Sequence, residues 1–165
     1  MSWLGTVTAP TPFEAVLGQR PELLERYRAF YTTLFDPSRV PGRVLELCRL
    51  HVAAIHDCAA EWRIRDARVA LTDDELASLA SGEFTQFDGV ERAALEIAER
   101  MPYQQHAIDD AQVAAVQAAL GPAGTVALLT AIAFFDATCR LKLVLDVESV
   151  EVVLQRPPLR DGALV

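Results

Sequence analysis

The sequence predicts an all-α protein, a compact bundle of about six or seven helices. Three observations support this fold class. Apolar residues recur at helical spacing, Gly and Pro are concentrated between those periodic segments, and the alternation typical of strands is nearly absent. The 165 residues are 52% hydrophobic and 23% charged, which is enough for one domain with a full core. We therefore expect a single domain over residues 1–165.

The first half of the chain is expected to hold three helices. Pro21 to Phe35 places leucine and aromatic residues at helical spacing behind a proline suited to a first turn. After a break rich in Pro and Gly, a second helix is expected from about Arg43 to His56. Asp57 is a good N-cap residue, so a third helix is expected to begin at Cys58.

Two capping boxes predict the next helices. The first, Thr72 to Glu75, opens a short helix that ends near Gly82. The second, Asp88 to Glu91, opens a helix that runs to about Met101.

The last third of the chain is expected to hold the closing helices of the core. Asp109 or Asp110 starts a helix that Gly121-Pro122 stops, and a long helix follows from Ala123 to about Leu145. Val150 to Leu154 is consistent with a short strand or an extended arm.

Charge and targeting features limit the function classes. There are 15 Lys and Arg against 23 Asp and Glu, a net charge of −8, which argues against nucleic-acid and membrane-surface roles. The longest apolar run, Val126 to Phe135, is too short to span a bilayer and predicts a core helix. The first 18 residues lack a signal-peptide pattern, and three cysteines do not suggest a secreted disulfide framework. We therefore expect a cytoplasmic protein with reduced thiols.

The most informative stretch runs from Glu46 to Arg65. Eleven residues separate Glu46 from Cys58, and Glu61 follows Cys58 by one helical turn on the same face. A thiol in the first turn of a helix is favoured as thiolate by the aligned backbone N–H groups. Glu61 either takes the thiol proton or, as a nearby negative charge, raises the thiol pKa.

This pattern resembles the alkyl hydroperoxidase D-like superfamily, which includes the carboxymuconolactone decarboxylases. Its peroxidase branch carries a glutamate, eleven residues, then C-x-x-C and x-x-x-H. Glu46 matches the relay glutamate, and Cys58 matches the first cysteine. The other three positions differ from that pattern: Glu61 stands in place of the second cysteine, Ala60 in place of the histidine between the cysteines, and Arg65 in place of the closing histidine. Glu61 followed by Trp62 is similar to a peroxidase-related branch that has Glu-Trp in place of the second cysteine.

The resemblance covers about residues 37–147, with the N-terminal helix (21–36) before that core and a C-terminal arm (148–165) after it. It implies an alkyl hydroperoxidase D-like helical fold and homo-oligomers, as dimers, trimers or hexamers. It also implies thiol-dependent reduction of a small hydroperoxide substrate, an antioxidant oxidoreductase activity, with Cys58 as reactive thiol and Glu46 as proton relay. No cofactor is implied. Because Glu61 cannot resolve an oxidised Cys58, turnover needs Cys48, Cys139 or an external thiol reductant.

Two other functions remain open. One is acid–base chemistry without redox, as in the decarboxylase branch, with Glu46 and Glu61 moving protons and Arg65 or Arg49 holding a substrate carboxylate. It predicts activity that thiol alkylation does not affect. The other is a catalytically degenerate scaffold or ligand binder, which predicts a Glu61–Arg65 pair and a Cys58 sealed from solvent.

Several side chains have a second interpretation as ordinary structure. Glu46, Arg49 and His56 share an arc of about 80° on their helix, a candidate pocket wall or simply its wet face. His56, Trp62 and Arg65 are the substrate-binding candidates. Structural alternatives are ion pairs of Arg49 with Glu46 and of Arg140 with Asp136, and core positions for Cys48 and Cys139. His51 and His56 are five residues apart and diverge on one helix, so no metal site is expected.

Overall fold

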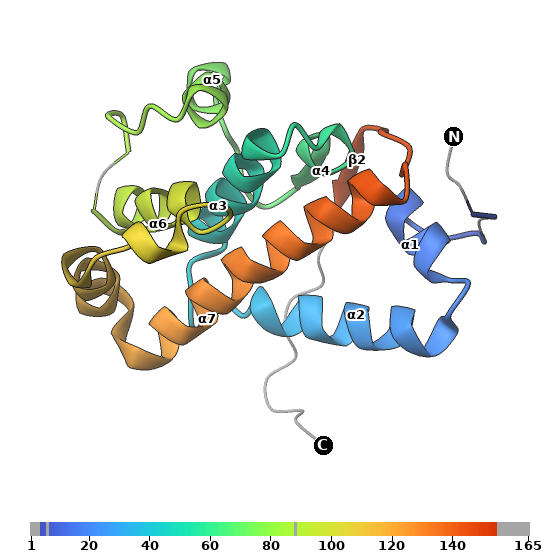
Figure 1. The fold of residues 1–165 in the computed structure, drawn as a ribbon, viewed down its shortest axis with the longest axis horizontal. Helices are drawn as coiled ribbons and strands as arrows, with labels where there is room; N and C mark the ends of the chain where they lie inside the picture. Colours follow the sequence, from blue (N-terminus) through green and yellow to red (C-terminus); the bar gives the residue numbers. More distant parts are fainter. Residues whose placement is uncertain (1–3, 6, 88, 155–165) are drawn as a thin grey trace.

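The computed structural model describes residues 4–5, 7–87 and 89–154, and within them the chain is mostly helical (Figure 1). The elements in chain order are α1 (Pro12–Leu17), α2 (Pro21–Leu34), α3 (Gly42–Ile55), α4 (Ala59–Trp62), β1 (Ile64–Asp66), α5 (Asp73–Ser81), α6 (Gly89–Arg100), the 3-10 helix η1 (Gln105–Ala107), α7 (Asp110–Val144) and β2 (Val152–Leu154). The helical fold class expected from the sequence is confirmed at this level.

Helix α3 lies at the centre of the fold. All its residues from Val44 to Ala53 are buried, including the charged Glu46 and Arg49. It packs against α5, α6 and α7, and α7 crosses the whole molecule in front of it (Figure 1). The core thus surrounds α3 on several sides, and its polar side chains must find partners inside the protein.

Helix α7 is two helices joined at Gly121. Gly121 has φ 68° and ψ 175°, a backbone conformation that favours glycine, and Pro122 follows it. The expected break at Gly121-Pro122 is therefore confirmed, and so is the helix start, where Asp109 and Gln112 form both bonds of a capping box. Among the described helices, α7 is long and apolar enough to cross a membrane by length and composition, a test that core helices of globular proteins also pass.

The other helix boundaries agree with the sequence to within a few residues. The capping box of Thr72 and Glu75 forms both of its bonds, and Gly82 ends α5 with φ 74°. Helix α6 ends at Arg100, one residue before the expected end, and its expected cap Asp88 lies outside the described residues. The short helix α1 was not expected.

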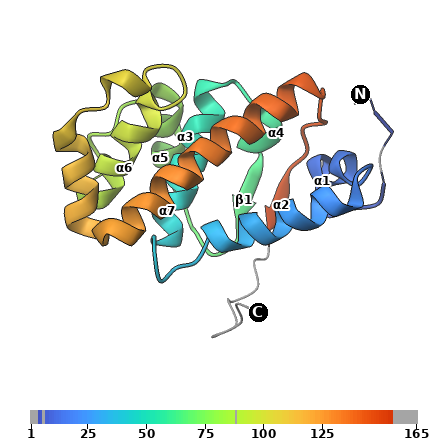
Figure 2. The same cartoon turned by 60° about the horizontal axis from the view of Figure 1, so that its bottom comes forward.

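A small parallel sheet adds two short strands to the helical fold. Strand β2 falls within the segment that was expected to be a strand or an arm, and it pairs with β1, which was not expected at all. Ile64 lies opposite Val152 and Asp66 opposite Leu154. The helix expected after Cys58 consequently has only four residues before the chain becomes extended. Figure 2 shows the two strands side by side between α2 and the body of the fold.

Candidate functional site

The end of α3 places Cys58. The N–H of Cys58 donates to the Ala53 carbonyl at 2.8 Å and that of Asp57 to the Ala54 carbonyl at 3.0 Å, while Asp57 has φ 50°. These bonds form a Schellman motif, in which the left-handed residue is usually glycine. Asp57 therefore ends α3 and is not the N-cap of the next helix. Cys58 itself occupies that cap position, and its side chain makes no capping bond.

Cys58 and Cys139 are brought together from positions 81 residues apart. The Cys58 sulfur lies 3.9 Å from the Cys139 carbonyl oxygen, and both residues are buried, at 1% and 0% exposure. A hydrogen bond from the Cys139 side chain lowers the pKa of Cys58 and raises that of Cys139. Burial alone raises the pKa of the third thiol, Cys48. The pair thus contains one thiol biased toward thiolate and one that stays protonated beside it.

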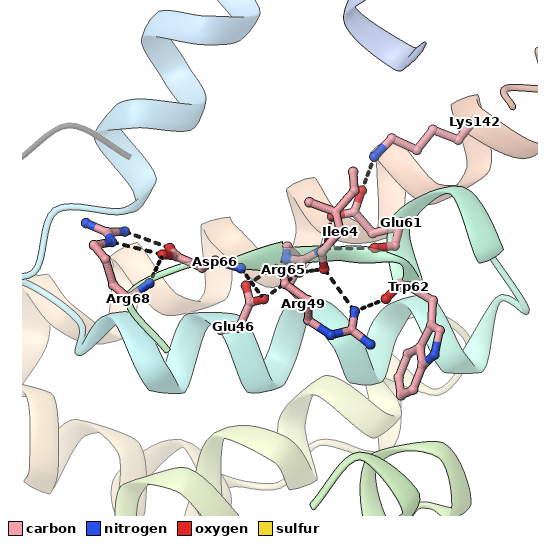
Figure 3. A network of polar contacts seen from close by, with 9 residues as sticks. All are labelled: Glu46, Arg49, Glu61, Trp62, Ile64, Arg65, Asp66, Arg68 and Lys142. Carbon is pink, nitrogen blue, oxygen red and sulfur yellow. Dashed lines mark hydrogen bonds and ion pairs between the residues drawn. The ribbon is translucent and has the colours of Figure 1, made fainter. Parts of the chain in front are cut away.

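A chain of buried charges, shown in Figure 3, ends in two side chains, Glu61 and Lys142, whose charges act on Cys58. Arg49 donates to both oxygens of Glu46, at 2.9 and 2.6 Å, and to Glu61 Oε1 at 2.6 Å. The other Glu61 oxygen accepts from the Lys142 ammonium of α7. All four side chains are at most 4% exposed. Two carboxylates and two cations alternate, so the buried cluster is neutral as a unit, as burial of charge requires.

Strand β1 completes the network. The Asp66 N–H donates to Glu46 Oε1 at 3.0 Å, and the Ile64 carbonyl accepts from Arg49 at 2.6 Å. The Asp66 carboxylate is held in turn by the Arg68 guanidinium at 2.7 Å (Figure 3). The unexpected strand therefore supplies backbone partners that the buried Arg49 and Glu46 need.

The charges of the network act on Glu61 and on Cys58. Burial alone would raise the pKa of Glu61, but Lys142 and Arg49 lower it to about 2. The hydrogen bond of Cys139 has the largest effect on the pKa of Cys58 and lowers that pKa, whereas burial raises it. The positive charge of Lys142 also lowers the pKa of Cys58, and the negative charge of Glu61 raises it. Glu61 and Lys142 therefore lie close enough to tune the thiol.

A cavity of about 240 Å³ opens beside Glu61 and Lys142. Aromatic residues of α2 and its end form one wall, namely Tyr27, Tyr31 and Phe35. Ile64 and Leu154 line the cavity from the sheet, and the remaining lining residues are Pro10, Thr11, Glu14, Arg28, Thr32 and Arg68. A mostly apolar cavity with a few polar groups is the usual form of a small-molecule site, and this volume is below the ~300–1,000 Å³ typical of drug-sized ligands.

The substrate-binding candidates lie elsewhere. Arg65 donates to the carbonyls of Trp62 and, at 3.0 Å, of Ile64, and its guanidinium lies 5.4 Å from the centre of the Trp62 ring. His56 bonds Asp136 at 2.6 Å. None of the three is among the residues that line this cavity. The stripe of Glu46, Arg49 and His56 forms neither a wall of this cavity nor a solvated face, because Glu46 and Arg49 are buried and bonded to β1 and Glu61.

The two carboxylates expected at the site are held by other groups. The hydrogen bonds of Glu46 in the described residues go to Arg49 and Asp66. Glu61 pairs with Arg49 and Lys142 instead of Arg65, because Arg65 turns back onto backbone carbonyls. Of the two observations that a degenerate ligand binder predicts, the sealed Cys58 is present and the Glu61–Arg65 pair is not.

His51 does not join a metal cluster. Its Nδ1 lies 2.8 Å from the Leu79 carbonyl, and its ring packs edge-on against Phe84. Within residues 4–5, 7–87 and 89–154, no group of three or more His, Cys, Asp or Glu side chains has the arrangement of a metal site.

Lys142 was not among the residues expected at the site. It is the only lysine in the chain, against 14 arginines, and it stands between leucines in an apolar helix. Lysine is rarely buried unless paired, so a single lysine at such a position is a usable signal of a buried partner. Cys139 was recognised only as a core residue that would resolve Cys58 if the fold brought it close, and the structure does bring it close.

Comparison with protein-family models, curated proteins and solved structures finds no match to this chain.

Proposed function

We propose that the protein is a peroxidase-related thiol oxidoreductase that reduces a small hydroperoxide, with Cys58 as the reactive thiol and Cys139 as the resolving thiol. The observation that carries the proposal is the position of the Cys58 sulfur, 3.9 Å from the Cys139 carbonyl oxygen, together with the hydrogen bond of the Cys139 side chain that lowers the pKa of Cys58. A reactive thiol needs thiolate character, and a resolving thiol needs to lie within reach of it.

The proposed reaction balances with two thiols. The Cys58 thiolate attacks the distal oxygen of the hydroperoxide, the O–O bond breaks, and the alcohol leaves with a proton. Cys58 is then a sulfenic acid. The Cys139 thiol attacks the Cys58 sulfur, the disulfide forms, and water leaves. Two equivalents of an external thiol, or one dithiol, then reduce the disulfide, become a disulfide themselves and restore both cysteines.

Glu61 and Lys142 have the roles closest to the thiol. Lys142 favours the thiolate, and its ammonium, which lies on the cavity, is the group that holds a proton for the leaving alcohol. Glu61 is ionised because its pKa is about 2, so it positions that ammonium and takes the proton from no partner. Glu46 holds Arg49, and Arg49 holds Glu61, so Glu46 is a positioning residue in this proposal.

The cavity supports a substrate of modest size. Glu61 and Lys142 lie on its surface, and the charges of both act on Cys58, so in this proposal the hydroperoxide reaches the sulfur past this ion pair. The aromatic wall formed by Tyr27, Tyr31 and Phe35 favours an organic hydroperoxide with an apolar body over hydrogen peroxide.

The proposal is tested by hydroperoxide consumption with dithiothreitol as external reductant. Cumene hydroperoxide should be consumed by the wild type and by Cys48→Ser, the matched control at another buried cysteine. Cys58→Ser should abolish thiol-dependent consumption. A Cys58→Ser protein that is as active as the wild type excludes the proposal.

A second candidate function is favoured by one observation: Glu61 and Lys142 line the cavity, whereas Cys58 does not. This arrangement supports acid–base chemistry without redox on a carboxylate substrate, in which the ion pair moves the proton. Under it, thiol alkylation leaves activity intact and Glu61→Gln removes it.

Self-association is also proposed. Val126, Leu141, Leu143 and Val144 of α7 are 48–74% exposed, which is unusual for apolar side chains on one long helix and supports a second copy of the chain as the partner. Light scattering after size-exclusion chromatography should give a mass above the 18.1 kDa of the monomer, and Val144→Glu should lower it. A monomeric wild type would exclude this part of the proposal.

A further inference from the structure

A second polar cluster lies outside the thiol site and joins three elements. His56, at the C-terminal cap of α3, places Nε2 2.6 Å from the Asp136 Oδ1 atom of α7. The Tyr103 hydroxyl, in the turn after α6, lies 3.0 Å from His56 Nδ1. A carboxylate, an imidazole and a hydroxyl therefore follow one another through hydrogen bonds.

The chemistry of these groups sets the direction of the bonds. An ionised carboxylate only accepts, so the Nε2–H of a neutral His56 donates to Asp136. His56 Nδ1 is then the ring's acceptor, and the Tyr103 hydroxyl donates to it. The phenol proton thus points at a base whose tautomer is fixed by a carboxylate, as in activated hydroxyl nucleophiles.

Burial differs sharply along the cluster. The His56 side chain is 2% exposed and that of Asp136 22%, whereas Tyr103 is 59% exposed. The base and its partner are shielded, and the phenol is open to reagents from solvent. The cluster therefore presents a reactive hydroxyl at the surface and does more than tie α3 to α7.

Arg140 supports the exposed end. It donates to Asp136 Oδ1 and to the Pro102 carbonyl, each at 3.0 Å, so it fixes the turn that carries Tyr103. Its guanidinium carbon lies 5.0 Å from the centre of the Tyr103 ring. A cation at that place favours the negative charge that develops as a phenol gives up its proton and attacks.

We propose that Tyr103 is an acylation site at which the phenol oxygen acts as nucleophile toward activated acyl esters. The Tyr103 oxygen attacks the acyl carbon while its proton passes to His56 Nδ1. The bond to the leaving alcohol or thiol then breaks, and His56 returns the proton to that group. The products are an acyl ester on Tyr103 and the free alcohol or thiol. Asp136 is a positioning residue, and the proposal does not depend on the thiol chemistry.

The test uses p-nitrophenyl acetate as the acyl donor, with peptide mass spectrometry to follow acetylation of Tyr103. The reference is the acetylation rate of N-acetyltyrosinamide under the same conditions. This comparison uses the wild-type protein alone, so it does not depend on the folding of any variant. General-base assistance should make Tyr103 react about 100-fold faster than this free phenol. The rate should fall at acidic pH, where a protonated imidazole no longer accepts the proton.

Two variants separate chemistry from structure. His56→Gln removes the base, so Tyr103 should react at about the rate of the free phenol and lose the acid limb of its pH profile. Asp136→Asn should slow acetylation and change that profile, because an amide also stabilises the other imidazole tautomer. Far-UV circular dichroism checks that both remain folded. Equal Tyr103 rates in the wild type and N-acetyltyrosinamide, or in the wild type and folded His56→Gln, overturn the proposal.

Discussion

The Cys58 sulfur and the Cys139 carbonyl oxygen lie 3.9 Å apart, and the two buried thiols share a hydrogen bond across 81 positions of the chain. This relationship changes how the Glu46–Cys58 spacing is interpreted. The position expected for a second cysteine holds Glu61, but the last long helix supplies a second thiol close to Cys58. The candidate site is thus a dithiol backed by a buried ion network.

Removing Cys139 should trap the first oxidation product. In Cys139→Ser, the Cys58 sulfenic acid has no neighbouring thiol to resolve it, so dimedone should label Cys58 after one equivalent of hydroperoxide. The wild type should label weakly because it forms the disulfide. Cys48→Ser is the matched control and should behave as the wild type. Strong labelling of Cys58 in that control instead would assign resolution to Cys48.

Lys142 should set the reactivity of Cys58. Its positive charge lowers the thiol pKa, so Lys142→Met should move the pH midpoint of Cys58 alkylation by iodoacetamide to higher pH. Arg140→Met removes an exposed cation of the same helix and should leave the midpoint in place. An unchanged midpoint in folded Lys142→Met would show that the ammonium does not act on the thiol.

Glu61 should make stability depend on acid. Its folded pKa of about 2 lies below the ordinary 4.5, so its contribution is present above pH 4.5 and is lost as the pH falls toward 2. Glu61→Gln should lower the free energy of unfolding at pH 7 by about 3–5 kcal/mol, since it leaves buried cations under-compensated. Urea denaturation should show this difference shrinking as the pH falls from 4.5 to 2.

The control for that series is Glu22→Gln. Glu22 pairs with Arg20 on the surface, where both side chains are more than half exposed, so the change should leave the free energy of unfolding at pH 7 nearly unchanged. If Glu61→Gln were as mild as Glu22→Gln, the buried network would not contribute as described.

Asp57 is strained at the end of α3. Its φ of 50° lies in the left-handed region, where glycine has no Cβ penalty, so Asp57→Gly should raise stability by about 0.5–1 kcal/mol. Thermal denaturation should show a higher Tm, whereas Asp57→Val should lower it. A lower Tm for Asp57→Gly would argue that the Asp57 side chain itself supports the turn before Cys58.

Local rules predicted most of the helices. The Thr72 capping box and the Gly121 break are set by residues a few positions apart, so the sequence contains all the information needed to place them. Strand β1 has three residues and exists only because Val152, far along the chain, pairs with Ile64. No periodicity can appear in so short a strand, so local patterns could not predict it.

The candidate site was predictable only in part. Cys58 and Glu61 stand out by position, and the Glu46–Arg49 pair follows from their spacing, but its burial does not. The partners that decide the chemistry, Cys139 and Lys142, come from α7 and are more than 75 residues away. Such partners depend on tertiary packing, which a single sequence does not encode in local patterns.

The most direct test of the dithiol is peptide mass spectrometry of the reduced protein after treatment with one equivalent of cumene hydroperoxide. We predict a disulfide between Cys58 and Cys139, with Cys48 still reduced, and its reversal by dithiothreitol. If all three cysteines remain reduced while the hydroperoxide persists, the thiol pair is structural and the account is contradicted.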